Sequence, residues 1–569
     1  MESTTGSSVQ RDPNRWPPQI KFIVGNEAAE RFSYYGMKSI LALYITTALA
    51  QTADRATTII HLFGFANYFM PLFGAWLSDR FWGRYRTILW ISFSYCAGHG
   101  VLAMSDLFAT IDGKLVCLYL GLNLIAFGAG GIKPCVSAFM GDQFGPDQGH
   151  LMRKAYGAFY FSINFGSFFS FIIIPWIASK PTALAANAGF FDQALWQLKH
   201  AGFTGYSWAF AVPGILMAIA TLIFWVGTRH YIRKPPAHTA GFFPVFLTAL
   251  RRMPSDNFGL RAAAGVSMLT TIFLPVLIMV LMVFVGLQTH VTPATKLVAK
   301  IALGCAALWY LLVLGASLLD RAELPEAFWK GARSAFSNEE IHAARSVAPI
   351  LAVLALVPAF WALFEQSNST WVLQGAQMQP FNLLGFKIEA EEMQSLNPLL
   401  VMILVPVLNW VVYPLIERVG PRVTALRRMS VGLLLTAASY VIVGWLQGRL
   451  EAKESLSLAW QAVPYIVLTT AEVLVSTTGL EFAYTQAAPS MKSSIMSFWL
   501  LTVAFGNLLV TTITQLGGGH GSESVSSGRF YQYAGLTAGV AVLFIIVAAC
   551  YRYRHTSTPA EPAVGTAKP

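Results

Sequence analysis

One stretch near the start of the chain carries an unusual set of ionisable residues. The segment Glu-Ala-Ala-Glu-Arg-Phe-Ser-Tyr-Tyr-Gly-Met-Lys begins at residue 27. In a helix, where each residue turns by about 100°, its acids, bases and phenols fall within an arc of about 140°. These residues are Glu27, Glu30, Arg31, Tyr34, Tyr35 and Lys38. Two carboxylates among cations can hold and release a proton, so this face is predicted to line a wet cavity. The alternative is a structural ladder of ion pairs between helices.

Further polar residues interrupt apolar runs elsewhere in the chain. They are His61, Lys133, Asn164, Glu365, Asn397 and Glu472. A charged side chain at the centre of a bilayer costs about 2.5–3.5 kcal/mol, so it normally faces a cavity or a partner. A lone histidine fits a proton relay or a packing role equally well. A lone asparagine fits ligand contact or helix packing.

The charges are divided unevenly along the chain. The cations Arg31, Lys38 and Lys133 come from the first half, whereas Asn397 and Glu472 come from the second. Glu472 has no cation near it in the sequence. This division suits a ligand with a carboxylate at one end and an ammonium group at the other, such as a small peptide or an amino acid.

The composition indicates which elements position these residues. The chain has 569 residues, of which 55% are hydrophobic and only 12% charged, and its mean hydropathy is +0.54. An ordinary soluble chain is about a quarter charged, so a soluble or disordered protein is excluded. About 20 apolar residues cross a bilayer as a helix, which gives about fourteen spans along this chain.

The predicted fold class is therefore an all-α membrane protein. Two six-helix bundles are expected at residues 21–228 and 341–555. A linker at 229–340 is expected to carry two accessory transmembrane helices near 260–319. The simplest interpretation of these two helices is that they face lipid. A disordered cytoplasmic arm at 1–20 and a disordered tail at 556–569 complete the predicted organisation.

The net charge predicts the orientation. Lys and Arg number 39 against 28 Asp and Glu. With a cytoplasmic N-terminus, the inner loops collect roughly twenty-five Lys and Arg and the outer loops roughly ten. We therefore expect a multi-pass protein of the cell inner (plasma) membrane with both termini cytoplasmic. The basic surplus then belongs to loops beside the lipid bilayer, which disfavours a nucleic-acid partner.

Several other classes of site lack a signal in the sequence. The first 19 residues are polar and contain no apolar segment, so no signal peptide is expected. The five cysteines show no metal-ligand spacing, and no nucleotide loop or zinc motif occurs. We expect no metal, no cofactor other than protons as the coupling ion, and no obligate protein partner.

The residues above, taken with their neighbours, resemble the proton-dependent oligopeptide transporters of the major facilitator superfamily. The opening segment matches the family's Glu-x-x-Glu-Arg-Phe-x-Tyr-Tyr-Gly motif. The other matches are Gly74–Arg86, Phe159–Gly166, Phe360–Gln366, Gln394–Leu399 and Thr478–Gln486. They occur in order between about residues 25 and 500, and two extra helices between the bundles are what bacterial members have.

The resemblance implies a role for each candidate residue. Arg31 and Lys133 would receive the peptide carboxylate, with Lys38 as a third cation of the substrate site. Lys38 stands where many members have arginine; it keeps the charge without the planar fork. The remaining substrate-binding residues would be Tyr34, Tyr35 and Tyr68 in the pocket, Asn164, Asn397 and Glu472 at the amine, and Trp499 as a pocket aromatic. Proton coupling would involve Glu27, Glu30, His61 and Glu365.

The implied function is a proton-coupled symporter that imports di- and tripeptides by alternating access and is not an enzyme. One alternative is a transporter of the same fold for another solute, such as nitrate, a drug or a metabolite. A second is a membrane sensor that binds peptide without moving it, although no soluble signalling domain is visible. A membrane enzyme is a third, but no nucleophile elbow or metal spacing supports it.

Overall fold

The computed structural model describes residues 16–179, 205–236, 242–252, 266, 269–319, 324, 326–420, 423–517 and 523–553. Long helices make up nearly all of these residues, and a short antiparallel hairpin joins β1 (Phe381–Leu383) to β2 (Phe386–Ile388). The predicted all-α class is confirmed. Most of the predicted arm and tail, and the start of the span near 260, lie outside the described residues.

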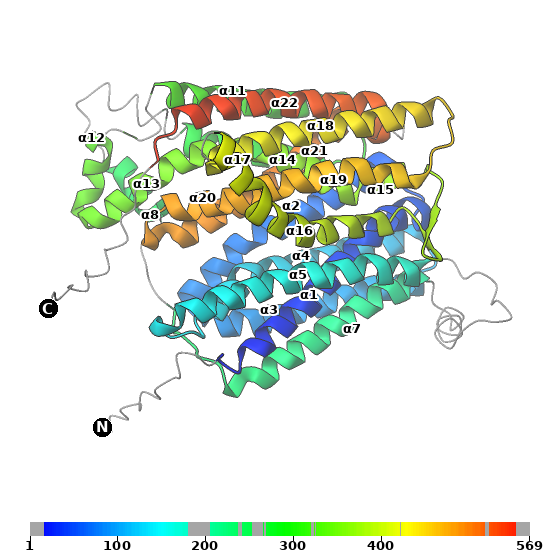
Figure 1. The fold of residues 1–569 in the computed structure, drawn as a ribbon, viewed down its shortest axis with the longest axis horizontal. Helices are drawn as coiled ribbons and strands as arrows, with labels where there is room; N and C mark the ends of the chain where they lie inside the picture. The colour runs from blue at the N-terminus through cyan, green and yellow to red at the C-terminus, as the bar shows by residue number, and fades with distance from the viewer. Residues whose placement is uncertain are drawn as a thin grey trace.

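The first half of the chain forms one group of helices, coloured blue to cyan-green in Figure 1. Its helices are α1 (Ile20–Leu43), α2 (Ala53–Leu77), α3 (Gly83–Ala103), α4 (Ile111–Gly141), α5 (Gly149–Ala178) and α7 (Gly205–Val226). Side-chain caps fix several starts, because Thr52 accepts from the Arg55 amide and Thr110 from the Gly113 amide. Helix α1 packs against α5 and α7, and α3 packs against α4 and α7.

The second half forms a group of its own, in which α18 packs against α19 and α22. Its helices are α13 (Asn338–Leu354), α14 (Pro358–Phe364), α15 (Thr370–Gly375), α16 (Leu396–Val407), α17 (Tyr413–Val419), α18 (Ala425–Glu451), α19 (Ala462–Glu472), α20 (Thr478–Gln486), α21 (Lys492–Gly517) and α22 (Ser527–Cys550). Short 3-10 or π turns link several of them, including η8 (Glu365–Asn368), η9 (Glu392–Ser395) and the π turn η12 (Val473–Thr477).

The linker supplies the short helices α8 (Phe242–Arg251) and α12 (Glu326–Trp329), and the longer helices α10 (Leu274–Leu287) and α11 (Pro293–Leu318). Helices α10 and α11 pack against each other and against α21. They add to the second half of the molecule, as Figure 1 shows for α11 beside α22.

The two ends of the helix bundle differ in character. We call the end that carries the β1–β2 hairpin the hairpin end. We call the opposite end, where Arg84, Lys234 and Arg428 lie, the basic end. Helix α1 runs from the basic end to the hairpin end (Figure 1).

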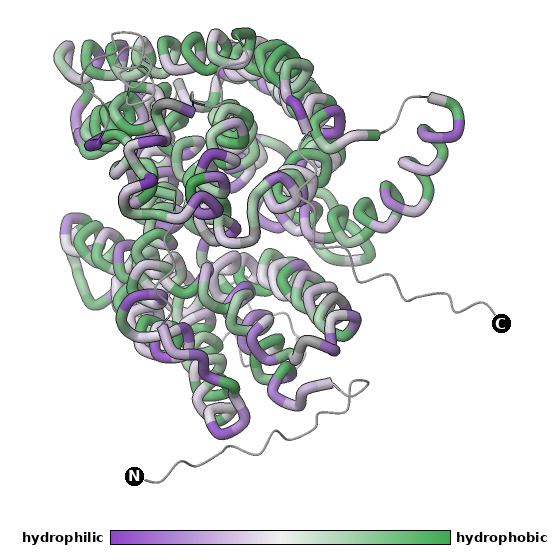
Figure 2. Tube along the Cα trace, turned by 90° about the vertical axis from the view of Figure 1, so that its left-hand side faces the viewer, coloured by the Kyte–Doolittle hydropathy of each residue, from purple (hydrophilic) through white to green (hydrophobic). Residues whose placement is uncertain are grey.

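The outer surface is apolar, as a bilayer requires. Figure 2 shows mostly hydrophobic helices interrupted by hydrophilic residues. Trp410 lies within a helical segment of mean hydropathy 2.3, and its side chain is 80% exposed. An exposed tryptophan in an apolar helix is suited to contact with lipid. Within the described ranges, ten helices are long and apolar enough to cross a membrane, or eleven if the bent pair α13–α14 is one span. The count of fourteen stays a prediction.

Two features explain part of the difference between the fourteen predicted spans and the ten or eleven found in the described ranges. The stretch Ala53–Leu107 is one continuous helical run of 55 residues, about twice what one span needs. Helix α1 is absent from the ten, and it carries five charged residues: Lys21, Glu27, Glu30, Arg31 and Lys38.

Candidate functional site

The predicted stripe on α1 begins with a buried ion-pair cluster. Arg31 Nε lies 2.7 Å from Glu27 Oε1 and 3.1 Å from Glu30 Oε2. Both carboxylates are almost fully buried, whereas the Arg31 side chain keeps 14% of its surface exposed. One guanidinium therefore balances two acids, and only the cation reaches solvent-accessible space.

Lys133, on α4, faces the same stripe. Its Nζ lies 4.5 Å from the centre of the Tyr34 ring and 4.3 Å from that of Tyr68. No hydrogen-bond acceptor among the described residues contacts this ammonium group. Two aromatic faces stabilise the cation without neutralising it. The Tyr34 hydroxyl accepts a hydrogen bond of 2.9 Å from Asn67 Nδ2.

Lys38 lies about one turn beyond Tyr34 and about two turns beyond Arg31 along α1, toward the hairpin end. Its partner comes from the other half of the molecule. Its Nζ is 2.5 Å from Glu365 Oε2, and both side chains are nearly fully buried. Lys38 and Glu365, predicted in separate roles as a substrate cation and a proton carrier, are therefore each other's partners.

Asn397 and Glu472 meet in the second half. Asn397 Nδ2 donates to Glu472 Oε2 at 2.6 Å and lies 3.2 Å from Thr469 Oγ1. Glu472 is half-buried and ends α19, directly before the π turn η12. Within the described part of the chain, no lysine or arginine lies within ion-pair distance of this carboxylate. Among the described residues, the acid accepts its hydrogen bond from the Asn397 amide, which also contacts the Thr469 hydroxyl.

Tyr35 connects the two sets of residues. It interacts electrostatically with Arg31 on its own helix and with Glu365 and Glu472 from the opposite half. Lys133 in turn interacts with Glu30, Arg31 and Lys38. The cations of the first half and the acid of the second half therefore lie within electrostatic range of Tyr35, and we call the region between them the central space.

His61 joins the two halves nearer the hairpin end. Its Nδ1 lies 2.8 Å from Asn507 Oδ1 on α21, and its Nε2 lies 2.9 Å from Ser369 Oγ. The ring is fully buried. Both nitrogens thus have partners in the second half, and the side chain contributes to the contact between the halves. A Cβ atom at Gly64 would lie 2.4 Å from Asn507 Oδ1, so only glycine permits this close approach.

Two predicted residues have mainly intrahelical or packing contacts. Asn164 is buried, and its Nδ2 donates to the Tyr160 carbonyl of its own helix at 3.0 Å. Trp499 is 5% exposed and meets the Trp361 ring edge-on, with ring centres 6.2 Å apart. Gly479 makes room for the Trp499 indole.

Several functional neighbours escaped the sequence reasoning. Asn67, Asn507 and Ser369 hold predicted residues by hydrogen bonds. Tyr160 interacts with Glu472 across the halves and is 41% exposed. The two asparagines carried a usable signal, because each interrupts an apolar helix. Ser369 and Tyr160 carried none, since serine and tyrosine are common in such segments.

Further contacts close the hairpin end. Gln394 Nε2, from η9, donates to the Ser39 carbonyl at 3.1 Å. The Ser524 amide donates to Asp54 Oδ1 at 2.8 Å. Near the basic end, by contrast, Asp142 pairs with Arg84 of the first half and with Lys234 at the start of the linker.

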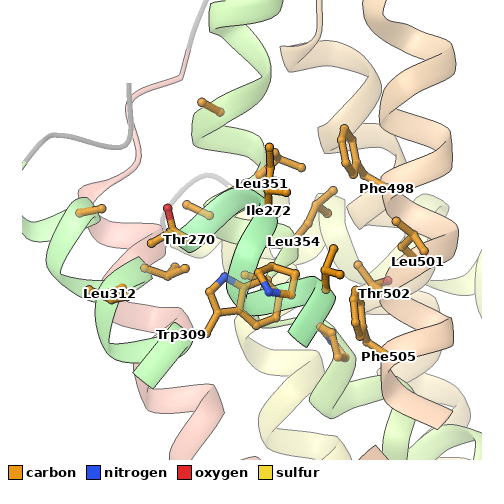
Figure 3. A pocket seen from close by; sticks show the side chains of 18 of the residues that line it. Thr270, Ile272, Trp309, Leu312, Leu351, Leu354, Phe498, Leu501, Thr502 and Phe505 are labelled. Atoms are coloured by element: carbon orange, nitrogen blue, oxygen red, sulfur yellow. The ribbon is translucent and has the colours of Figure 1, made fainter. Parts of the chain in front are cut away.

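A large apolar cavity lies away from these residues. It has a volume of about 820 Å³ and lies between the accessory helices and α13 and α21. Figure 3 shows Trp309, Leu351 and Phe505 lining it. None of the predicted site residues lines this cavity, although helix α21 contributes both to the cavity and to the candidate site. In the described ranges, no group of three or more His, Cys, Asp or Glu side chains could hold a metal ion.

Comparison with known proteins agrees with this arrangement. The sequence model of the POT family matches residues 85–518. The chain is 32% identical over 455 residues to "Peptide transporter family 1" of Drosophila melanogaster, covering 79% of this chain and 50% of that protein. It is 30% identical to human "Solute carrier family 15 member 2", covering 82% of this chain and 54% of that protein. The chain thus spans about half the length of the curated relatives it matches.

Solved structures match over the whole length. An auto-inhibited POT family peptide transporter superposes with a TM-score of 0.77 at 37% identity, covering 96% of this chain and 99% of that one. The POT family transporter PepTSo gives a TM-score of 0.75 at 38% identity, with 94% and 98% covered. The family match covers most of the chain, and the fold agrees from end to end. The chain belongs to the POT family.

Proposed function

We propose that the protein is a proton-coupled symporter that imports di- and tripeptides by alternating access. The observation that carries the proposal is the division of charge across the central space. Arg31 and Lys133 line one wall, and the Asn397–Glu472 pair lines the other. The names of the relatives, which are peptide transporters, support the same substrate class.

A peptide fits this division by its two termini. Its carboxylate pairs with Lys133, whose ammonium group lies over the Tyr34 and Tyr68 rings and has no hydrogen-bond acceptor among the described residues. Its amine pairs with Glu472, which has an amide partner and lacks a cation in the described part of the chain. Charge-assisted hydrogen bonds are about twice as strong as neutral ones, so both ends contribute to binding. A ligand with one charged end would leave one wall unmatched.

Proton coupling follows from the cluster around Arg31. With Glu27 and Glu30 ionised, both carboxylates hold the guanidinium. Protonation of one acid removes half of that attraction and releases Arg31 toward the peptide carboxylate. Peptide binding then draws the two walls together, and the halves rock about the central site. The protons act as the coupling ion, and the mechanism uses no other cofactor.

The orientation proposed from the loop charges puts the basic end in the cytoplasm of a cell inner (plasma) membrane. On this orientation the hairpin end faces outside. The Lys38–Glu365 pair and the His61 hydrogen bonds then close the outer entrance. In this proposal the structure corresponds to an inward-facing conformation. The predicted bundle limits, 21–228 and 341–555, define the two rocking bodies in this proposal.

The test is uptake into proteoliposomes with an acidic exterior and a negative interior. One charge moved through 100 mV contributes about 2.3 kcal/mol, and each unit of pH about 1.4 kcal/mol. Labelled dialanine is expected to accumulate, and an uncoupler to collapse the accumulation. Uptake that is equal with and without a proton gradient would contradict the coupling of peptide transport to protons. Competition by tripeptides but not by nitrate or free metabolites separates peptide transport from the same-fold alternatives.

A further inference from the structure

Three buried polar side chains inside the first half lack normal hydrogen bonds. They are Glu30 on α1, and Tyr95 and His99 on α3, and each is at most 1% exposed. Both His99 ring nitrogens and the Tyr95 hydroxyl have no hydrogen-bond partner of normal geometry among the described residues, and the Glu30 oxygens have none beyond the 3.1 Å ion pair with Arg31. Groups of this kind are rare in proteins because each costs about 1–3 kcal/mol. Three together call for a physical explanation.

The three groups form a continuous line. The Tyr95 hydroxyl faces the Glu30 carboxylate. The His99 ring stacks on the Tyr95 ring, with centres 5.2 Å apart and planes 23° from parallel. Helix α3 ends at Ala103 at the hairpin end, about 6 Å beyond His99 along the axis. The line therefore leads from the middle of the molecule toward the hairpin end.

The surroundings of His99 are apolar and tightly packed. Phe210 approaches the ring with its backbone, and a Cβ atom at Gly214 would lie 2.8 Å from His99 Cβ. In the described ranges no charged group faces His99 from α4 or α7. Tyr95 interacts with Glu30, Arg31 and Cys96. Apart from the Phe210 backbone, an uncharged imidazole in this setting has water to complete its hydrogen bonds.

Glu30 is also shielded from the substrate-facing wall, to which Arg31 is partly exposed. Arg31 keeps 14% of its side chain exposed, while the Glu30 side chain keeps 2%. Besides Tyr95, Glu30 interacts with Arg31, Glu27 and Lys133. On the other route, from the hairpin end through the central space, the Lys38–Glu365 pair stands in the way.

We propose that His99 and Tyr95 relay protons to Glu30 through the interior of the first half, with ordered water completing the line. This inference rests on the proposed function, in which Glu30 carries a coupling proton. A proton from water at the hairpin end binds one nitrogen of neutral His99, and the other nitrogen releases its proton toward Tyr95. The Tyr95 oxygen accepts it and passes its own hydrogen to the Glu30 carboxylate. One proton has moved to Glu30, and His99 is left as its other tautomer with the Tyr95 hydroxyl hydrogen replaced; reorientation of both groups resets the line for the next proton.

The proposal predicts a split between two transport assays. Counterflow exchanges labelled for unlabelled peptide without net proton movement, whereas accumulation requires it. The variants H99N and Y95F keep polarity or ring volume. We expect them to lower proton-driven uptake at least about tenfold and to leave counterflow nearly unchanged. The control is H230N, which removes an exposed histidine near the basic end. Equal losses in both assays, or no loss in either, would overturn the relay.

A second measurement does not depend on peptide. After a drop in external pH, infrared spectroscopy follows the carboxylic-acid carbonyl band that is absent in E30Q. The band is expected to appear at least about tenfold more slowly in H99N and Y95F than in the wild type and in H230N. Equal rates would overturn the relay even if the protein moves another solute. A wild type that shows the band but no peptide counterflow would contradict the proposed function alone.

Discussion

The two walls of the central space are built in different ways. On the first-half wall, Arg31 has two acidic partners within 3.1 Å, and Lys133 rests on two aromatic rings. On the second-half wall, Glu472 is held by Asn397. One wall thus contains a charge cluster that protonation can rearrange, and the other contains an acid that accepts a hydrogen bond from a neutral amide.

In the proposed mechanism, this difference gives the two walls separate tasks. A cluster whose ion pairs can be exchanged is suited to coupling, because a proton or a ligand carboxylate replaces one partner by another. An acid with only neutral partners is suited to recognition, because a ligand amine is its first cation. The walls meet at Lys38–Glu365, where each supplies one charge.

The largest expected effect comes from breaking that meeting point. K38Q leaves Glu365 buried without its cation, which costs about 3–5 kcal/mol. The closed hairpin end is expected to open. A cysteine in place of Thr58, which is buried and contacts Gln515 of the second half, should then become reactive toward an external membrane-impermeant thiol reagent in a background with the five native cysteines replaced. The double variant K38Q/E365Q is the control, because neither remaining amide is charged. Equal labelling of the single and double variants would contradict a role for the ion pair in closure.

The next effect tests the first-half wall. K133Q removes the ammonium group that lies between Tyr34 and Tyr68. We expect loss of about 3 kcal/mol of peptide affinity, or roughly a hundredfold, measured by competition against a labelled dipeptide. Y68F retains the aromatic face and is expected to bind within a few-fold of the wild type. Normal affinity in K133Q would place the peptide carboxylate elsewhere.

The second-half wall is expected to give a smaller and more selective effect. E472Q is nearly isosteric and can still bond to Asn397, so folding is retained. Affinity for free-amine dipeptides should fall by about 2 kcal/mol. The matched control is an N-acetylated dipeptide, whose weak binding should be the same in both proteins. An equal loss for both ligands would remove Glu472 from recognition of the amine.

The smallest expected effect is a pH dependence at the hairpin end. Glu391 lies just before η9, is 7% exposed and has its pKa raised to about 8 by burial and by repulsion from Glu392 and Glu389. The buried, closed arrangement is therefore most stable below the ordinary pKa near 4.5 and is weakened as the pH rises toward 8. Gln394 contacts both the Glu391 carbonyl and the Ser39 carbonyl, which links this segment to closure.

The measurement compares how readily a cysteine at the hairpin end reacts with the external membrane-impermeant thiol reagent at pH 5 and at pH 8. The wild type is expected to be a few-fold less accessible at pH 5, and E391Q is expected to lose the difference. The exposed neighbour variant E389Q serves as the control. A dependence on pH that survives in E391Q would assign the effect to another group.

Much of the fold and of the site could be predicted from the sequence. Hydrophobic length marks the helices, and helical periodicity brings Glu27, Glu30 and Arg31 to one face, where the structure pairs them. The cost of charge in an apolar helix singled out Lys133 and Glu472. These signals are local, and each needs only the residues within one helix.

The pairing between helices could not be predicted in the same way. Lys38 and Glu365 lie 327 residues apart, and His61 and Asn507 lie 446 residues apart. Which distant groups meet depends on how the two halves dock, and no local pattern records it. The unpartnered His99 illustrates the same limit, because its significance rests on what its neighbours lack.

The π turn η12 directly after Glu472 has a consequence for substitutions in this helix. A π turn holds one more residue than an α-helical turn, so it offsets every later side chain by about 100°. Here that offset separates Glu472, at the central space, from Glu481, whose carboxylate pairs with Arg428 at 3.5 Å. Deleting one residue from Val473–Thr477 would rotate the part of the helix nearer the basic end as a block, which would move Gly479 and change the fit of the Trp499 indole while leaving Glu472 in place.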